Sequence, residues 1–274
     1  MDYIKTLFNI ENKVALLTGG GGVLAGEMAK GFLNAGAKVV LLDINEFNLQ
    51  NKIVSLAKLG GDVIGLKCDV LNEASIKEVH QKIMEKYNRI DILVNAAGGN
   101  MPGATIGIGQ TVFDLQLEAL KKVMDLNLNG TILPTLIFGK TMADQESGSI
   151  INISSMASYR IITRVVGYSA AKAAIDNFTK WMAVEMAQKF GSGIRVNAIA
   201  PGFLITDQNR TLLTNEDGSL TERGNAILNM TPFKRFGEPN ELVGTVIWLA
   251  SDASKFVTGT IVPIDGGFSI FSGV

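Results

Sequence analysis

Short apolar runs recur along the chain at intervals that suit a parallel β-sheet. Each run is six to nine residues long, and most are followed by turn residues and then by a longer segment with helical spacing. The predicted strands are 13–18, 38–43, 62–69, 90–98, 149–154, 194–202 and 259–267. Strands that are almost continuously apolar are typical of a sheet covered by helices on both faces. The pattern therefore predicts an α/β fold built on a doubly wound parallel sheet.

The segments between these runs predict helices and one irregular excursion. Helices are expected at 24–36, 46–59, 73–87, in a long stretch after the Gly-rich loop 99–111, and at 166–190. Residues 203–237, after the sixth strand, are polar and break the alternation, as expected of a lid over a binding site. No Pro- or Ser-rich linker divides the chain. We therefore expect one Rossmann-type domain, 1–274, that contains the lid.

Four consecutive glycines, at 19–22, lie between the first strand and the first long helix. Glycine costs roughly 0.5–1 kcal/mol relative to alanine in regular structure, so the run indicates a need for bare backbone. In a doubly wound sheet this turn binds a dinucleotide pyrophosphate, because backbone N–H groups at the helix N-terminus meet the phosphates. The structural alternative is an ordinary tight turn.

Asp43 ends the second predicted strand, 24 residues after Gly19. A carboxylate at this place can accept hydrogen bonds from the adenosine ribose and would repel a 2′-phosphate. With no basic residue beside it, Asp43 favours NAD as the cofactor over NADP. An aspartate at a strand end is also a common cap for the following helix.

The composition argues against several other classes of protein. The 274 residues are 47% hydrophobic with a net charge of −1 and no long basic run, so no nucleic-acid partner is expected. The N-terminus lacks the pattern of a signal peptide, and no apolar stretch is long enough to cross a bilayer. Cys68 is the only cysteine, which leaves no disulfide and no zinc-type cluster. We expect a cytoplasmic protein with a small-molecule substrate, no membrane partner and no metal.

The helix at 166–190 carries a candidate proton-transfer pair. Tyr168 and Lys172 are four residues apart and therefore share a helix face. Tyrosine has an ordinary pKa of about 10, and a neighbouring ammonium, aided by a cationic nicotinamide ring, is expected to lower it. Tyr168 could then exchange a proton with an alcohol or carbonyl during hydride transfer. The structural alternative for Tyr168 and Lys172 is an amphipathic pair on the helix surface. Ser155, at the end of the fifth predicted strand, could hold the substrate oxygen and so favours the catalytic interpretation.

Several motifs occur together in one order. They are TGGGG (18–22), CDV (68–70), NAAG (95–98), NLNG (127–130), Ser155, YSAAK (168–172) and APGFLIT (200–206). In these motifs the chain resembles the short-chain dehydrogenase/reductase family over essentially its full length. The resemblance implies a homotetramer, joined through the helices that carry Asn127 and Tyr168.

The resemblance also implies roles for individual residues. The catalytic set is Asn127, Ser155, Tyr168 and Lys172, in which Asn127 orients a water in a proton relay leading to Lys172. The cofactor residues are Gly19, Gly22, Leu24, Asp43, Asp69, Val70, Asn95, Ala96, Gly98, Tyr168, Lys172, Pro201, Gly202, Leu204 and Thr206. Asp69 and Val70 are expected at the adenine end, and Pro201 to Thr206 on the nicotinamide side.

One departure from the family concerns the glycine turn. The family usually reads TGxxxGxG, but Val23 and Ala25 stand here at the second and third glycine positions. The glycine run lies earlier instead, with one more glycine at Gly26. We infer a slightly reshaped turn in which Gly22 takes the role usually filled one residue later, while small Ala25 still permits close packing of helix on strand.

Within the family, four stretches resemble bacterial D-mannonate oxidoreductases (fructuronate reductases), which interconvert D-mannonate and D-fructuronate. They are LLTGGGGVLAGEMAK, NAAGGNMPGAT, TRVVGYSAAKAAIDNFTKW and APGFLITDQNR. A sugar acid needs a cation for its carboxylate and polar groups for its hydroxyls. Arg164 is the first candidate for the carboxylate and Arg210, in the lid, the second; Asn100, Asn209 and Ser155 are candidates for hydroxyls. A solvated or subunit-contact role is the alternative for each arginine.

Other functions stay open from the sequence. The enzyme could act on another polyol, a gluconate or a 3-oxoacyl substrate, although an acyl-carrier partner would favour a basic patch that this near-neutral chain lacks. From another class, the chain could be a non-catalytic NAD(H)-sensing module, but a sensor has no need for the whole catalytic set. His80, the only histidine, is predicted to be a surface residue.

Overall fold

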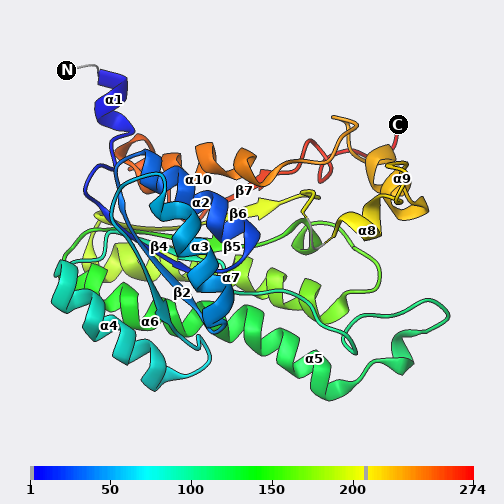
Figure 1. The fold of residues 1–274 in the computed structure, drawn as a ribbon, viewed down its shortest axis with the longest axis horizontal. Helices are drawn as coiled ribbons and strands as arrows, with labels where there is room; N and C mark the ends of the chain where they lie inside the picture. Colours follow the sequence, from blue (N-terminus) through cyan, green and yellow to red (C-terminus); the bar gives the residue numbers. More distant parts are fainter. Residues whose placement is uncertain (1–2, 207–208) are drawn as a thin grey trace.

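The apolar runs form the strands of one parallel sheet in the computed structural model, which describes residues 3–206 and 209–274 (Figure 1). The strands are β1 (Val14–Thr18), β2 (Lys38–Asp43), β3 (Val63–Lys67), β4 (Ile92–Asn95), β5 (Gly148–Ile153), β6 (Ile194–Pro201) and β7 (Ile261–Ile264). Within the described residues they make a seven-stranded sheet in the order β3-β2-β1-β4-β5-β6-β7. All neighbours run parallel, which confirms the predicted fold class. Between β1 and β4 the strand order reverses, and such a switch point is where a doubly wound sheet binds its ligand.

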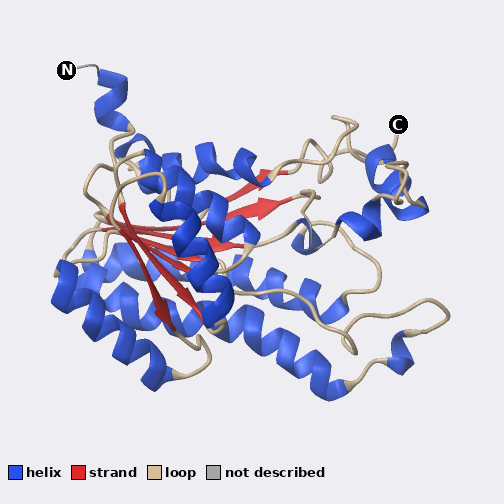
Figure 2. Ribbon diagram, in the orientation of Figure 1, coloured by secondary structure: helices blue, strands red, loops and turns tan. Residues whose placement is uncertain are grey.

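Helices cover both faces of this sheet, as Figure 2 shows. They are α1 (Tyr3–Leu7), α2 (Val23–Asn34), α3 (Glu46–Ala57), α4 (Glu73–Tyr87), α5 (Leu117–Met124), α6 (Gly130–Asp144), α7 (Val166–Phe190), α8 (Arg210–Leu213), α9 (Glu222–Asn229) and α10 (Val243–Ala250). Side chains of α2, α3 and α10 pack on one face, and those of α4, α6 and α7 pack on the other. No helix in the described ranges is both long and apolar enough to span a membrane.

Strand β1 shows how the sequence pattern produces these layers. Ala15 and Leu17 point into the core under α2, whereas Val14 and Leu16 point into the core under α4 and α7. All four side chains are almost completely buried because successive residues of a strand face opposite sides of the sheet. Burial of each large aliphatic side chain contributes about 1.5–3 kcal/mol.

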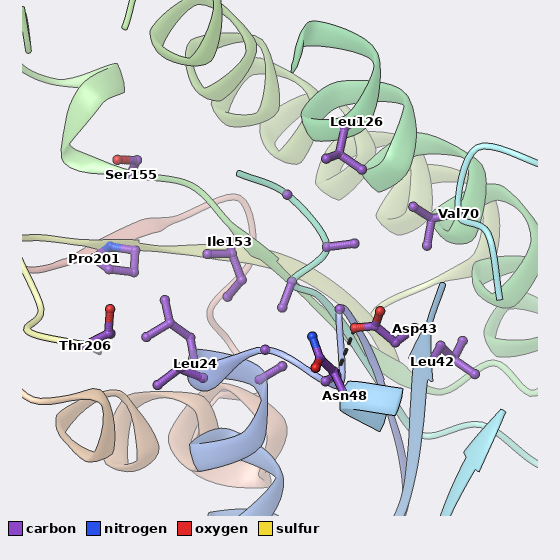
Figure 3. A pocket seen from close by; sticks show the side chains of 18 of the residues that line it. Leu24, Leu42, Asp43, Asn48, Val70, Leu126, Ile153, Ser155, Pro201 and Thr206 are labelled. Carbon is purple, nitrogen blue, oxygen red and sulfur yellow. Dashed lines mark hydrogen bonds between the residues drawn. The ribbon is translucent and has the colours of Figure 1, made fainter. Parts of the chain in front are cut away.

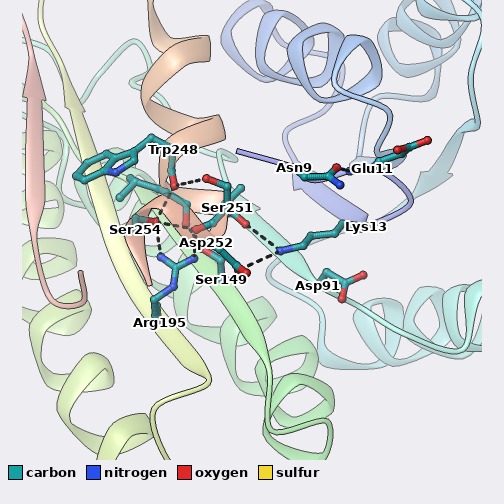
Figure 4. Close-up of polar contacts among 12 residues, drawn as sticks. Asn9, Glu11, Lys13, Asp91, Ser149, Arg195, Trp248, Ser251, Asp252 and Ser254 are labelled. Atoms are coloured by element: carbon teal, nitrogen blue, oxygen red, sulfur yellow. Dashed lines mark hydrogen bonds and ion pairs between the residues drawn. The ribbon is translucent and has the colours of Figure 1, made fainter. Parts of the chain in front are cut away.

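Polar contacts fix α10 to the edge of the sheet opposite the carboxyl ends of the strands. The buried Arg195 of β6 donates from Nη1 to Ser254 Oγ at 2.8 Å and from Nη2 to Ser251 O at 3.2 Å (Figure 4). Ser149 of β5 donates to Leu249 O at 2.8 Å. These bonds satisfy the last turn of α10 and the chain that follows it, which would otherwise leave carbonyl groups without partners.

The polar excursion at 203–237 leaves and rejoins the fold at one point. Leu204 and Gly237 form an isolated parallel bridge, and Ile205 N donates to Gly237 O at 2.8 Å. Between these points lie α8 and α9, on the side of the molecule toward which β6 and β7 point (Figure 1). Asp207 and Gln208 of this segment lie outside the described residues.

Candidate active site

The glycine turn brings bare backbone against two neighbouring strands. Gly19 has φ +65°, and a Cβ on it would lie 2.9 Å from Ala96 O, so both conformation and space require glycine. A Cβ on Gly21 would lie 2.9 Å from Asn48 Cβ and 3.1 Å from Asp43 Oδ2. Gly22 is the N-cap residue of α2, and its role at the cofactor stays a prediction. The glycines thus allow the backbone of the turn to pack closely against neighbouring segments on more than one side.

This turn forms one wall of a cleft of about 770 Å³, within the usual range for a ligand site. Most of the predicted cofactor residues line it: Gly19, Gly22, Leu24, Asp43, Asp69, Val70, Ala96, Gly98, Tyr168, Pro201, Gly202, Leu204 and Thr206. Figure 3 shows Leu42, Asp43 and Val70 toward one end and Ser155 and Pro201 toward the other. Among the described residues, no lysine or arginine lines this cleft.

Asp43 joins the end of β2 to the glycine turn. Its Oδ2 accepts a hydrogen bond from Gly21 N at 2.9 Å, and its Oδ1 accepts one from Asn45 N at 2.8 Å. The carboxylate is therefore held in a fixed orientation on the cleft wall, with further acceptor capacity on each oxygen.

Ser155, Tyr168 and Lys172 come together where β5 ends and α7 begins. Ser155 follows β5 and accepts a hydrogen bond from Ala157 N at 3.2 Å. Lys172 lies one helical turn after Tyr168, with its Nζ 5.4 Å from the centre of the tyrosine ring. Lys172 Nζ donates to Ile153 O at 2.7 Å, which fixes the ammonium beneath the cleft. Ser155 and Tyr168 line the cleft and Lys172 supports them from α7.

Burial controls the ionisation of this pair. It raises the pKa of the Tyr168 phenol above its ordinary value, although the hydrogen bond with Ser155 opposes the rise. Burial also lowers the pKa of Lys172 to about 8, against the opposing charge of Asp176. The sequence predicted a lowered pKa for Tyr168 because of Lys172. Burial is the larger effect in the structure and raises this pKa, so the lowering by Lys172 together with a bound nicotinamide ring stays a prediction.

Asn127 lies in a π-helical turn, Asp125–Asn129, between α5 and α6. Its Nδ2 donates to Gly99 O at 2.7 Å and Val123 O at 2.8 Å, and its Oδ1 accepts from Gly99 N at 3.1 Å. A Cβ on Gly98 would lie 2.6 Å from Asn127 Oδ1, which explains the glycine there. The side chain thus clamps the loop after β4 to the helix; its role in a proton relay stays a prediction.

Some predicted site residues do not line the cleft. Asn95, expected beside the cofactor, is buried in the core and donates to Thr135 Oγ1 at 2.8 Å and Asn152 Oδ1 at 2.9 Å. Asn100, expected at the substrate, accepts a hydrogen bond from Met101 N at 3.0 Å and is exposed.

The remaining substrate candidates lie in or near the lid. Asn209 lines the cleft, but its amide bonds to Thr206 N and Leu204 O at 2.8 Å each and so shapes the lid itself. Arg164 and Arg210 are outside the cleft lining. Arg210 is exposed on α8, and Arg164 lies in the loop before α7.

The cleft also includes residues that the sequence analysis did not select. They are Gly21, Val23, Ala25, Leu42, Ile44, Asn48, Cys68, Leu71, Ala97, Leu126, Ile153, Ser154 and Phe203. Most are immediate neighbours of selected residues, so the motifs that contain them were the available signal. Leu126 precedes Asn127 in the π-helical turn, whereas Asn48 comes from α3 and no local pattern indicated it.

Comparison with known proteins places this cleft in a family. A family model described as enoyl-(acyl carrier protein) reductase matches residues 22–269. The uncharacterized oxidoreductase UxuB of Bacillus subtilis (strain 168) is 42% identical over 275 residues, which cover 97% of this chain and 98% of the relative. An uncharacterized oxidoreductase of Haemophilus influenzae is 43% identical over 278 residues, which cover 97% of this chain and 96% of the relative. The chain belongs to the short-chain dehydrogenase/reductase family.

A solved structure extends the likeness to the whole fold of this short-chain dehydrogenase/reductase. A proposed D-mannonate oxidoreductase from Haemophilus influenzae, with NAD bound, matches with a TM-score of 0.92 and 42% identity, covering 99% of this chain and 100% of that one. The family resemblance seen in the sequence is confirmed, and the chain is an oxidoreductase of a family that acts on CH–OH groups.

Proposed function

We propose that this enzyme is an NAD(H)-dependent oxidoreductase that interconverts a secondary alcohol and a ketone of a sugar acid, with D-mannonate and D-fructuronate as the substrate pair. The observation that carries the proposal is that Ser155 lies at the end of the cleft away from Asp43 (Figure 3), and that Tyr168, which also lines the cleft, is hydrogen-bonded to Ser155. A dinucleotide laid along the cleft would have its ribose at Asp43 and its reactive ring beside the two hydroxyls. The 42% identity to the NAD-bound relative supports the sugar-acid class.

The residues of the cleft fit NAD better than NADP. The Gly19–Gly22 turn offers backbone without side chains at the start of α2, which suits a pyrophosphate. Asp43 presents a fixed carboxylate, and no basic side chain among the described cleft residues could neutralise a 2′-phosphate. NAD is therefore the proposed cofactor, held by the residues predicted for it that line the cleft.

The chain supplies the proton chemistry of the reaction. When bound, the nicotinamide supplies or accepts the hydride. Tyr168, kept protonated at neutral pH by its burial, is in the form that donates a proton to a ketone oxygen. Ser155 is placed to hold the same oxygen, and the Lys172 ammonium, fixed on Ile153 O, favours the phenolate that remains.

The homotetramer implied by the family is part of the proposal. Trp181 and Val184 lie one turn apart on α7 and are 60% and 57% exposed, and Leu136 on α6 is 55% exposed. Large apolar side chains exposed on the surface are typical of a protein–protein contact when they form one patch. These helices follow, or carry, the catalytic residues Asn127 and Tyr168, so the contact would support the site.

The test is a substrate panel read by NADH absorbance. We expect D-fructuronate to be reduced with a higher kcat/KM than an uncharged ketose, glycerol-type polyols or a 3-oxoacyl substrate. The Tyr168→Phe variant should bind NADH nearly as well as the wild type but lose on the order of 10²-fold or more in kcat. A higher kcat/KM for the 3-oxoacyl substrate would assign the enzyme to acyl reduction. Tight NADH binding with no turnover on the whole panel would identify a sensor.

A further inference from the structure

The chain that follows β7 has a fixed shape. In this C-terminal segment, residues 265–271, Asp265 Oδ1 accepts a hydrogen bond from Gly267 N at 2.9 Å, and its Oδ2 accepts one from Ser269 N at 2.7 Å. Phe268 N also donates to Asp265 O at 3.2 Å. Because one carboxylate binds two backbone N–H groups, the C-terminal segment is a defined turn whose outer carbonyl groups point in set directions.

Arg160 ties the C-terminal segment to the loop that carries Ser155. Its Nε donates to Ser269 O at 3.0 Å, and its Nη2 donates to Phe271 O. The side chain is half-buried, and it lies five residues after Ser155. A planar guanidinium can hold two carbonyl groups at once in one geometry, whereas a lysine ammonium has no such fork.

Hydrogen bonds join Arg160 to Ser155 within that loop. Ser155 Oγ accepts from Ala157 N at 3.2 Å, and Ser155 O accepts from Ser158 Oγ at 2.8 Å. Arg160 N donates to Met156 O at 2.9 Å. The loop is thus a compact turn, so the place of Arg160 constrains the place of Ser155.

Phe268 ties the same segment to the base of the lid. Its ring meets that of Phe203 edge to face, with the ring centres 5.1 Å apart and the planes at 78°. Phe203 lines the cleft, and its carbonyl accepts a hydrogen bond from Gly237 N at 3.0 Å, where the lid rejoins the fold. Phe233 N also donates to Gly266 O at 3.2 Å, and Figure 1 shows the C-terminus on the side where α8 and α9 lie. The C-terminal segment therefore contacts both ends of the lid.

We propose that Arg160 and Phe268 are positioning residues that, through the C-terminal segment, set the place of Ser155 relative to Phe203 in the wall of the cleft. Neither of the two is among the described residues that line the cleft, so each acts through the residue that it holds. The inference rests on the proposed oxidoreductase function but not on which ketone is the substrate. A displacement of about 1 Å at a reacting group can cost on the order of 10²-fold in rate.

Kinetics of single and double variants test the proposal. Arg160→Met, Phe268→Ala and the double variant are compared on whichever ketone the wild type reduces best, with NADH saturating. We expect each single variant to lower kcat/KM by about tenfold to a hundredfold. NADH affinity, measured by fluorescence titration, should change far less, because Asp43 and the glycine turn hold the other end of the cleft. The double variant should lose less than the product of the single losses, because both contacts act through one segment.

Conservative variants separate positioning from a general loss of structure. Phe268→Tyr keeps the ring and should retain most of the activity. Arg160→Lys keeps the charge without the fork and should lose as much as Arg160→Met. Ile270→Ala is the matched control, because Ile270 belongs to the same segment but is 85% exposed. Wild-type kcat/KM in Arg160→Lys, or single losses that simply multiply in the double variant, would overturn the proposal.

Hydrogen exchange tests the contact without turnover. Ile205 N donates to Gly237 O at 2.8 Å, and Gly237 N donates to Phe203 O, so these two amides report opening at the base of the lid. In Phe268→Ala both should exchange faster by about two- to tenfold, the worth of an aromatic pair, and neither should change in Ile270→Ala. Unchanged exchange, or an equal increase in the amides of β1, would refute the positioning role. A wild type that reduces no ketone would refute the proposed function instead.

Discussion

Lys172 is a basic group held almost completely out of water. It is 4% exposed, and one of its ammonium donors is bonded to Ile153 O. Burial lowers its pKa from 10.5 to about 8. Between these two values the unfolded chain binds a proton that the folded chain releases, so this group makes stability rise as pH rises. Below about pH 8 both states are protonated, and the full cost of burying the charge is present.

The first prediction uses this difference. Lys172→Met removes the buried charge, so the stability of the wild type relative to the variant should increase by on the order of 2–3 kcal/mol from about pH 7 to about pH 10. Chemical unfolding at one protein concentration, at both pH values, measures it. Lys180→Met, on the exposed side of α7, controls for loss of a lysine from that helix. A difference that is flat or that decreases with pH would contradict the lowered pKa of Lys172.

The residues of the site differ in how well their roles could be predicted from the sequence. Tyr168 and Lys172 share a local spacing on one helix, so their proximity followed from helix geometry alone. The pKa of Tyr168 depends on how much protein covers it, which no local pattern encodes.

At the scale of elements, the β1–α2 turn and the end of β2 act as one unit through Asp43. The carboxylate accepts a hydrogen bond from Gly21 N at 2.9 Å while it faces the cleft. Structural and cofactor roles, which were alternatives in the sequence, are thus compatible in one side chain. The next prediction separates them.

Asp43→Ala should lower the free energy of unfolding by about 1 kcal/mol, because Gly21 N loses its acceptor, and should raise the KM for NAD. Asp43→Asn keeps an oxygen acceptor but removes the charge, so it should preserve most of the stability while narrowing the preference for NAD over NADP. Unfolding curves and kcat/KM for both cofactors measure the two effects. A wild type with the higher kcat/KM for NADP would refute the role of Asp43 in cofactor choice.

Helix α10 and the division between α5 and α6 were not predicted from the sequence, and each has a physical explanation. Helix α10, VGTVIWLA, is apolar almost throughout and therefore shows little of the polar face by which a surface helix is recognised. The long helix predicted after 111 is divided into α5 and α6 by the π-helical turn at Asp125–Asn129. Hydrophobic spacing does not report one extra residue in a helical turn, and such turns are frequent at functional sites.

At the scale of the whole molecule, the continuously apolar strands predicted a sheet with helices on both faces. The oligomeric state cannot be predicted in the same way from the pattern of a single chain. Helices α7 and α6 expose apolar side chains, with Trp181, Val184 and Leu136 each more than half exposed. Phe47 on α3 is also exposed, at 75%, but lies on a helix of the other face of the sheet. The exposed fractions alone do not show which of these surfaces forms a subunit interface. The family resemblance favours an interface through α7.

The last prediction is that Trp181→Glu breaks the proposed homotetramer into smaller species. Packing the carboxylate against a second copy would remove it from water without a partner, which costs several kcal/mol per buried ion. Light scattering coupled to size-exclusion chromatography should give a tetramer for the wild type and for Phe47→Glu, the matched control, and a smaller mass for Trp181→Glu. Because α7 carries Tyr168 and Lys172, kcat should fall together with the mass. A Trp181→Glu tetramer, or dissociation only in Phe47→Glu, would move the interface away from α7 and leave the catalytic helix independent of assembly.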